Sequence, residues 1–235
     1  MGRSLYRVLL AVIVAAFIAG CQTSSYYRSD TLESGTGTRQ VMLMPTDVGL
    51  SLINAGGAPE PKADWTLKAR GFLEKSLRAK LAGQNLQLKF AAPVETLAPF
   101  GPEMQLLKLQ AAVGEAIMTH QFLPGASLPA KNGVFDWSLG PSVHLLRDKY
   151  AADYGLFVFL RDSYASPGRV ATIAIAALLF GVALPGGRQI GFASLVDLHT
   201  GAIVWINRLA RESGDMRNAE GADETIEQLL SNFPA

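Results

Sequence analysis

The chain has 235 residues, of which 21 are basic and 20 are acidic, so its formal net charge is +1. A nearly neutral chain offers no electrostatic basis for binding nucleic acid. Its single cysteine excludes a disulfide within the chain, and its length fits one domain that can bury a core of its own.

The amino terminus has the layout of a secretory signal peptide. Arg3 and Arg7 precede an uninterrupted apolar run at 8–18, and small residues follow it. This run is about half of the ~20 residues that a membrane-spanning helix needs. The segment 18–21, Ile-Ala-Gly-Cys, resembles the lipobox of bacterial lipoproteins, in which the cysteine receives a diacylglyceryl group and becomes the new amino terminus. We therefore predict a signal peptide at 1–20 and lipidation of Cys21. The alternative is an uncleaved single-span anchor.

Removal of the signal peptide gives the mature protein, and the residue after the cysteine indicates its location in the cell. Loss of Arg3 and Arg7 leaves 19 basic against 20 acidic side chains, a net charge of −1. Gln22, directly after the cysteine, is not aspartate; by resemblance to enteric lipoprotein sorting, this favours the outer membrane, with the protein facing the periplasm. Residues 21–38, rich in Ser, Thr, Tyr and Gly, are predicted to form a flexible tether, and residues 39–235 a single domain.

The first half of this domain alternates strands and helices. In chain order, the pattern predicts a strand at 41–45, a loop at 46–61, a helix at 62–82, a strand at 86–90, a helix at 103–120 and a helix ending at 150. The basic face of the first helix, at 68–80, is expected to be solvated, with contact to anionic lipid as the alternative.

A continuous apolar run at 152–160 predicts a central strand that is covered on both faces. Arg161 and Asp162 follow directly, at the carboxyl end of the strand, where sheets of α/β proteins often bind ligands. These two residues are weak candidates for a ligand-binding site. The simpler interpretation is a surface ion pair.

The segment 170–184 is fifteen residues long and uncharged, and Arg169 and Arg188 bracket it. As a helix it reaches about 22 Å, short of the ~30 Å hydrocarbon core, so it should not span a membrane. Three structures fit: a buried core helix, an exposed patch for oligomers or a partner protein, or an element that dips into the bilayer beside the lipid anchor. Apolar residues on all its sides argue against a helix lying flat in the interface.

The carboxyl-terminal part predicts strands at 189–198 and 202–209 and a closing helix at 222–233. His199, Thr200 and Gly201 form a hairpin turn between the strands, with the glycine where φ is positive, and Asp197 is expected to end the strand and brace this turn. The whole order predicts an α/β fold, with a mixed sheet of about five strands flanked by helices and an apolar helical insert at 170–187.

Three segments, at 41–45, 152–158 and 195–205, resemble the opening strand, a strand after a helix and a hairpin of one group of envelope lipoproteins. The group includes the amino-terminal domain of TolB, CsgG-type secretion lipoproteins and LpoB-type activators. The resemblance implies an anchored, non-catalytic α/β module that binds other proteins or self-assembles, and it carries over no active site. The chain departs from the group in longer segments at 46–61 and 91–137. Its insert lacks alternating membrane strands, so a pore is not supported.

The sequence contains no pattern for catalysis or for a cofactor. His120, His144 and His199 lack metal-ligand spacing, and neither a phosphate-binding loop nor a serine nucleophile motif occurs. We expect a protein that is not an enzyme, has no cofactor or metal, is held at the membrane by lipid, and binds an envelope protein or itself. The alternatives are a small-molecule or lipid-binding module near Arg161 and 170–184, and an envelope hydrolase in which Asp or Glu converges with His or Ser.

Overall fold

The computed structural model describes residues 23–28 and 39–234. Its strands, in chain order, are β1 (Thr23–Arg28), β2 (Arg39–Leu43), β3 (Asp47–Ile53), β4 (Pro59–Pro61), β5 (Leu86–Phe90), β6 (Tyr154–Ala165), β7 (Gln189–Asp197) and β8 (Ile203–Arg211). Its helices are α2 (Ala63–Ala82), α3 (Pro102–Phe122), α4 (His144–Tyr150), α5 (Pro167–Phe180) and α6 (Ala219–Leu229). The predicted signal peptide, Cys21 and most of the predicted tether lie outside the described residues.

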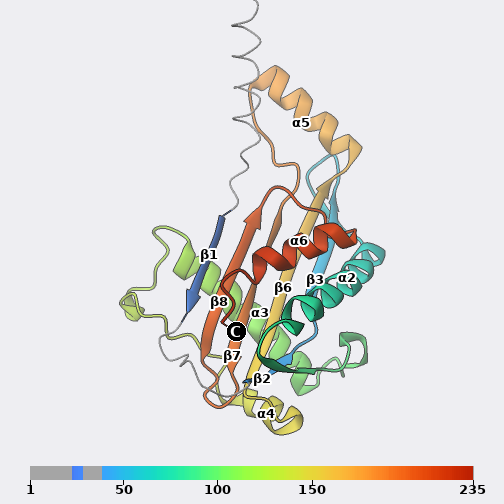
Figure 1. Cartoon of the computed structure of the whole chain (residues 1–235). Helices are drawn as coiled ribbons and strands as arrows, with labels where there is room; N and C mark the ends of the chain where they lie inside the picture. Colours follow the sequence, from blue (N-terminus) through green and yellow to red (C-terminus); the bar gives the residue numbers. More distant parts are fainter. Residues whose placement is uncertain (1–22, 29–38, 235) are drawn as a thin grey trace, which may run out of the picture.

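The described strands form one mixed sheet (Figure 1). Its main path is β1-β8-β7-β6-β2-β5, and β3, which pairs with β4, also lies beside β6. Strands β2 and β3 run parallel to β6, whereas β7, β8 and β1 follow one another antiparallel. The predicted α/β fold with a mixed sheet flanked by helices is confirmed. The sheet has eight strands among the described residues, more than the five or so expected.

The segment predicted as a loop, 46–61, contains β3 and β4, so that prediction was wrong. Strand β3 continues the line of β2: β2 pairs with β6 near Leu156, and β3 pairs with it from Phe159 to Ala165. A proline at 45 interrupts this line without ending it. Buried Val48 and Leu50 alternate with half-buried residues, but this alternation extends over only two buried residues. It was therefore too short to be recognised as a strand among the polar residues around it.

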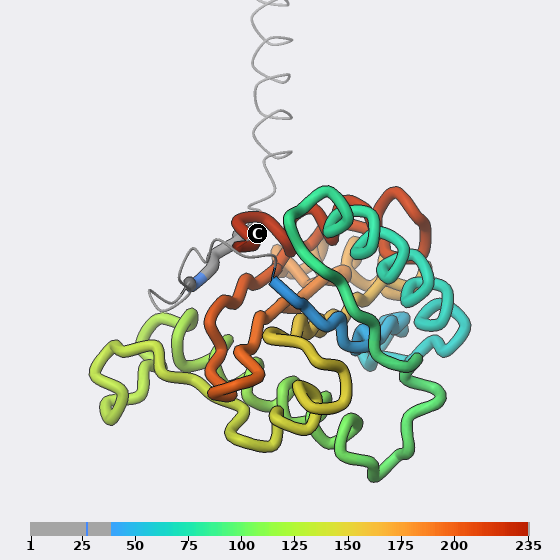
Figure 2. The backbone as a smooth tube through the Cα atoms, turned by 60° about the horizontal axis from the view of Figure 1, so that its bottom comes forward, coloured from blue at the N-terminus to red at the C-terminus, as the bar shows by residue number. Residues whose placement is uncertain are grey.

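Strand β6 is the central strand that the apolar run predicted. Because successive side chains point to opposite faces of a sheet, Leu156 and Val158 enter one core, whereas Phe157 and Phe159 enter the other. Helices α2 and α6 cover the first core, and α3 and α4 cover the second (Figure 2). An uninterrupted apolar strand is therefore explained by two helical layers, one on each side of it.

The hairpin between β7 and β8 has the predicted geometry. The Asp197 Oδ1 atom accepts hydrogen bonds from the backbone N–H groups of His199 (2.7 Å) and Thr200 (3.3 Å). Gly201 has φ of 79°, and a Cβ atom there would lie 2.4 Å from the carbonyl oxygen of Gly140. Asp197 thus braces the turn as predicted, and glycine is required at 201.

Two helix boundaries differ from the prediction for local reasons. Helix α6 begins at Ala219 instead of 222, because the Asn218 side chain accepts a hydrogen bond from the backbone N–H of Gly221 (2.9 Å) and caps the helix. Helix α4 is only seven residues long, because Gly140, with φ of 72°, and a following proline place a short 3-10 turn before it.

The predicted tether contains a strand. Residues Thr23–Arg28 pair antiparallel with β8, from Ala210 to Trp205. The sequence of this segment has no alternating apolar residues that would predict a strand. The segment extends the sheet by pairing with the outer edge of β8. The Tyr27 ring stacks on Phe135, with ring centroids 3.7 Å apart.

Candidate functional site

The candidate ligand-binding residues, Arg161 and Asp162, lie near the carboxyl end of β6 on opposite faces of the sheet. The Arg161 Nη1 atom lies 2.8 Å from Asp47 Oδ1 and donates to the Asp47 carbonyl oxygen (3.0 Å). Its guanidinium covers the Phe159 ring at 3.9 Å. Asp162 is buried, with 3% of its surface exposed. The prediction of a surface ion pair between Arg161 and Asp162 was therefore wrong: Arg161 pairs with Asp47 instead, and Asp162 is buried.

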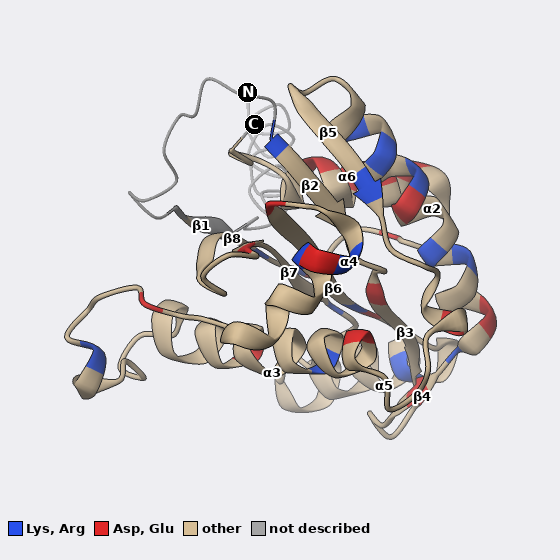
Figure 3. Ribbon diagram, turned by 90° about the horizontal axis from the view of Figure 1, so that it is seen from below, with Lys and Arg blue, Asp and Glu red and all other residues tan. Residues whose placement is uncertain are grey.

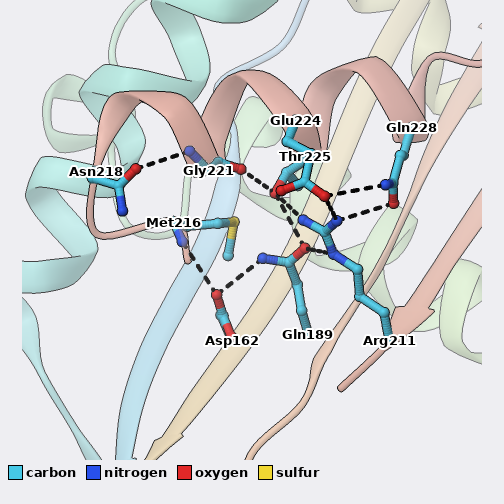
Figure 4. A network of polar contacts seen from close by, with 9 residues as sticks. All are labelled: Asp162, Gln189, Arg211, Met216, Asn218, Gly221, Glu224, Thr225 and Gln228. Carbon is cyan, nitrogen blue, oxygen red and sulfur yellow. Dashed lines mark hydrogen bonds and ion pairs between the residues drawn. The ribbon is translucent and has the colours of Figure 1, made fainter. Parts of the chain in front are cut away.

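Asp162 belongs to a buried polar network (Figure 4). Its Oδ2 atom accepts hydrogen bonds from Gln189 Nε2 (3.0 Å), from the Met216 backbone N–H (3.4 Å) and from the Tyr164 hydroxyl. Burial raises the pKa of Asp162 above its ordinary range, and the hydrogen bonds from Tyr164 and Gln189 act in the opposite direction. Burial and the neighbouring Asp162 raise the pKa of Tyr164, so its hydroxyl stays protonated and donates.

Arg211 extends this network to α6. Its side chain is 1% exposed, and its Nε donates to Gln189 Oε1 (2.7 Å). The two Nη atoms donate to Glu224 Oε1 (2.6 Å) and to Thr225 Oγ1 (3.0 Å), as Figure 4 shows. The network therefore joins the ends of β6, β7 and β8 to α6. Its polar atoms are occupied by one another, which suits fastening of the fold more than reaction with a substrate.

A groove lies beside Arg161, and Asp162 of the network is also among the residues that line it. It has a volume of about 470 Å³, and its walls include Gly49, Arg161, Ser163 and Arg188. Arg188 is exposed, and its backbone N–H donates to Ser163 Oγ (3.0 Å). The volume falls in the range of small-molecule sites. Of the two candidate residues, Arg161 is the one whose side chain is not buried; Arg188 was noted in the sequence only as a bracket of the apolar run.

A second hollow of about 420 Å³ lies between α3 and the sheet, and its walls include Met118, Phe159, Phe192 and Arg208. The sequence could not have indicated it, because its residues come from one helix and three strands that only the fold brings together. The predicted basic face of α2 includes an acidic residue: Glu74 lies among the five basic residues of this helix, and Asp64 precedes them (Figure 3). Arg70 pairs with Glu95, for example, and Lys80 lies 3.6 Å from Glu227.

Helix α5 lies beyond the end of the sheet (Figure 1). Arg169 is its one buried residue among those described. The exposed fractions of its large apolar side chains are 56% for Val170, 55% for Ile175, 85% for Leu178, 66% for Leu179 and 74% for Phe180. A buried core helix, the first of the three alternatives for this segment, is therefore wrong. None of the helices in the described part of the chain is long and apolar enough to cross a membrane.

The sequence around α5 explains why it is a helix. The Ser166 hydroxyl accepts a hydrogen bond from the Arg169 backbone N–H (3.1 Å) and caps the first turn, and Gly181, with φ of 65°, ends the helix. The Thr172 hydroxyl donates to a carbonyl oxygen one turn earlier (3.0 Å). The buried Arg169 guanidinium donates twice to the Pro185 carbonyl oxygen (3.1 and 3.3 Å), which holds the returning chain against the base of the helix.

Strand register places the start of β1 at the same end of the sheet as α5. Thr23 pairs with Ala210, Ala210 with Ile190, and Ile190 with Arg161, so these four residues form one row across neighbouring strands. We call this the α5 end of the sheet: β6 and β8 finish there, and β7 and β1 begin there. Cys21 lies outside the described residues, but only two residues before Thr23.

The three histidines are far apart in the chain, and the fold brings His144 beside the backbone of His199. His120 Nδ1 lies 2.7 Å from the Ala126 carbonyl oxygen, and His144 Nε2 lies 2.8 Å from the His199 carbonyl oxygen. No group of three potential metal ligands occurs within residues 23–28 and 39–234. Among the residues that the structure describes, Asp153 and His199 are the acid and histidine that lie closest, 3.5 Å apart on the exposed surface.

Comparisons with known proteins add little. No protein family model and no curated protein matches the chain. Among solved structures, the chain is similar to a point variant of PelC from Paraburkholderia phytofirmans, solved as a dodecamer, at 11% identity over 89% of this chain and 95% of that one, with a TM-score of 0.39. A second PelC dodecamer structure from the same organism gives 11% identity, 90% and 99% coverage, and a TM-score of 0.35. Similarity at this level supports no argument about function.

Proposed function

We propose that this protein is a lipid-anchored, non-catalytic interaction or assembly component of the bacterial cell envelope. It is attached through Cys21 at the outer membrane and faces the periplasm. The observation that carries the proposal is α5. The domain buries two cores of its own and still presents Leu178, Leu179 and Phe180 outside them. Contiguous exposed apolar surface of this kind marks an interaction site with a protein or a membrane.

The end of β6 supports a non-catalytic role. This is the position where α/β sheets usually present their reactive side chains. Here the Asp162 carboxylate accepts three hydrogen bonds from the protein itself, and Arg161 is paired with Asp47. Both residues contribute to the fold, since they join β6 to β7, to β3 and to the segment before α6.

Lipidation is tested by replacing its acceptor. In cells fed a fatty-acid probe, we expect the wild-type chain to be labelled and to sediment with membranes, and the Cys21→Ser variant to be unlabelled. Amino-terminal sequencing of the wild-type protein should find no residue before position 21. A labelled Cys21→Ser variant, or a wild-type protein that begins at Met1, would refute the anchor.

Association is tested separately in intact cells. Chemical cross-linking, followed by mass spectrometry of the purified products, should give a species that contains two copies of this chain or this chain with another envelope protein. A protein that remains a monomer without cross-linked partners at its native abundance contradicts the assembly role and leaves the anchor unaffected.

The groove beside Arg161 favours a second candidate function, the binding of a small molecule or a lipid. An arginine at its wall and another exposed arginine at its rim suit a ligand with an anionic group. Native mass spectrometry of protein extracted in mild detergent should then show a bound mass that is lost from the Arg161→Ala variant. A wild-type protein that carries no added mass counts against this function.

A further inference from the structure

We infer that α5 is inserted into the same bilayer leaflet that holds the acyl chains of Cys21, so that the protein is attached to the membrane at two points. The inference rests on the lipidation of Cys21 in the proposed function, and it identifies lipid as what covers α5. Three independent features support it: the place where β1 begins in the sheet, the chemistry of the helix, and the position of the charges around it.

The position of the amino terminus fixes which end of the domain meets the membrane. Position 21 is two residues before Thr23 in the sequence, and two residues of chain reach at most about 8 Å. Thr23 begins β1 in the row that contains Ala210, Ile190 and Arg161. Acyl chains on Cys21 therefore hold the bilayer surface at the α5 end of the sheet. Neighbouring strands are about 4.8 Å apart, so this row is only about 15 Å across from Thr23 to Arg161.

The chemistry of the helix suits hydrocarbon. Between its first and last turns, its backbone N–H and C=O groups are bonded within the helix, as a lipid environment requires. Between Arg169 and Arg188 the one polar side chain is Thr172, and its hydroxyl is bonded to the backbone. Protein interfaces carry about one hydrogen bond per 100–200 Å², which gives them register. The exposed face of α5 offers no polar side chain that a protein partner could engage in this way.

The burial pattern gives the helix a direction. Arg169, Thr172, Ile173 and Ala176 form the more covered side, whereas Leu178 and its neighbours at the far end are the most exposed. Fourteen helical residues reach about 21 Å, and interfacial elements penetrate about 5–10 Å, so an oblique helix of this length enters one leaflet without crossing the bilayer. A helix that enters the bilayer obliquely needs no polar face. The apolar residues on all sides of α5 argue against a helix that lies flat in the interface, but they do not argue against this insertion.

The charges lie at the base of this element. Arg169 is turned under the helix and bonded to the Pro185 carbonyl oxygen, so it does not meet hydrocarbon. Arg188, where the returning chain rejoins the sheet, is exposed, and its guanidinium makes no hydrogen bond or ion pair with the described residues. An arginine at this depth matches anionic lipid headgroups, which bind guanidinium groups in a bidentate manner.

The single cysteine of the chain allows a direct test in the full, processed protein. Because acylation removes the Cys21 thiol, a cysteine introduced by Leu178→Cys is the only free thiol and can be labelled with an environment-sensitive fluorophore. Ile175→Cys provides a second position on the same exposed face. Phe100→Cys is the matched control, since Phe100 is 87% exposed, apolar, and directly precedes α3 near α4, at the opposite end of the domain. Each protein is reconstituted into vesicles of phosphatidylethanolamine and phosphatidylglycerol.

We expect the probes at 175 and 178 to show a blue-shifted emission, to be quenched by lipids that carry a doxyl group on the acyl chain, and to resist quenching by aqueous iodide. The probe at 100 should behave in the opposite way. If the probes on α5 resist iodide and are not quenched by doxyl lipids, a protein covers the helix and the inference is wrong. If iodide quenches them as strongly as the control, α5 is in water and the inference is also wrong. Neither result affects the lipidation of Cys21, which the fatty-acid probe measures separately.

Discussion

Helix α3 contacts the sheet at a glycine, and this contact gives a sharp prediction of stability. A Cβ atom added at Gly114 would lie 2.1 Å from two carbon atoms of the Phe192 ring. That ring is 1% exposed and stacks on Phe159, with centroids 4.9 Å apart. An ordinary contact begins at 3.4 Å, so Gly114→Ala must widen the gap by about 1.3 Å, from 2.1 to 3.4 Å. Either α3 moves outward or the ring leaves its stacked position.

The expected cost follows from two opposing effects. Overpacking of a core costs about 1–3 kcal/mol, and an overlap as deep as the one at Gly114 belongs in the upper part of that range, at about 2–3 kcal/mol. Replacing a helical glycine by alanine stabilises the helix by about 1 kcal/mol. We therefore expect Gly114→Ala to lower the free energy of unfolding by about 1–2 kcal/mol. At roughly 2–4 °C per kcal/mol for a chain of this size, Tm should fall by about 2–8 °C.

Gly71→Ala is the matched control. Gly71 lies within α2, is exposed, and has no atom within 4 Å of an added Cβ. Only the helix-propensity effect acts there, so Tm should rise by about 2–4 °C. The assay is thermal unfolding, followed by circular dichroism in one detergent buffer. If Gly114→Ala matches or exceeds the wild-type Tm while Gly71→Ala behaves as expected, the close packing of α3 on Phe192 is refuted.

Three further predictions concern buried polar groups and use the same assay. Arg211→Met should lower the free energy of unfolding by about 1–3 kcal/mol, because it leaves the buried amide of Gln189 without its donor. An unchanged Tm would contradict this role. Asn207→Ala should lower the free energy of unfolding by about 1–3 kcal/mol, since its Nδ2 donates to carbonyl oxygens at the end of α6 and just after it, at 2.9–3.3 Å. A loss no larger than that of a substitution at an exposed site would contradict this role. Burial raises the folded-state pKa of Asp162, so the folded protein binds more protons than the unfolded chain, and the stability that this group contributes falls as pH rises from 3.8 through the raised pKa. Asp162→Asn should remove this fall. If the Tm–pH curves of the wild type and the variant run parallel, Asp162 does not cause the pH dependence.

The elements that sequence reasoning identified correctly are those with a local signal. The uninterrupted run in β6, the stripe of α2 and the turn at Asp197 each depend on residues that are neighbours in the chain, and each is present in the structure. Strand β1 was missed because it depends on a distant partner: its polar residues become a strand only when β8 offers a free edge. Strand β3 was missed because its two buried residues, Val48 and Leu50, make a pattern too short to outweigh the turn residues around it.

The candidate site divides in the same way. The sequence placed Arg161 and Asp162 at the end of a central strand, because an apolar run ends there. It could not reveal that Asp162 accepts hydrogen bonds from Gln189 and Met216, which lie 27 and 54 residues further along the chain. It also could not pair Arg161 with Asp47, 114 residues earlier, because β3 itself was not predicted. Side-chain partners across a sheet depend on strand order and register, which local patterns do not encode.

By itself, the sequence determined that the segment at 170–184 is apolar, helical in length and too short to span a bilayer, since composition and length are properties of the chain alone. Whether this helix is buried or exposed depended on the tertiary structure, because a helix that is apolar on all sides fits a core as well as a surface. Helices α2 and α6 cover one face of the sheet, and α3 and α4 cover the other. Because both faces are already covered, α5 remains outside, at the end of the sheet where β1 begins.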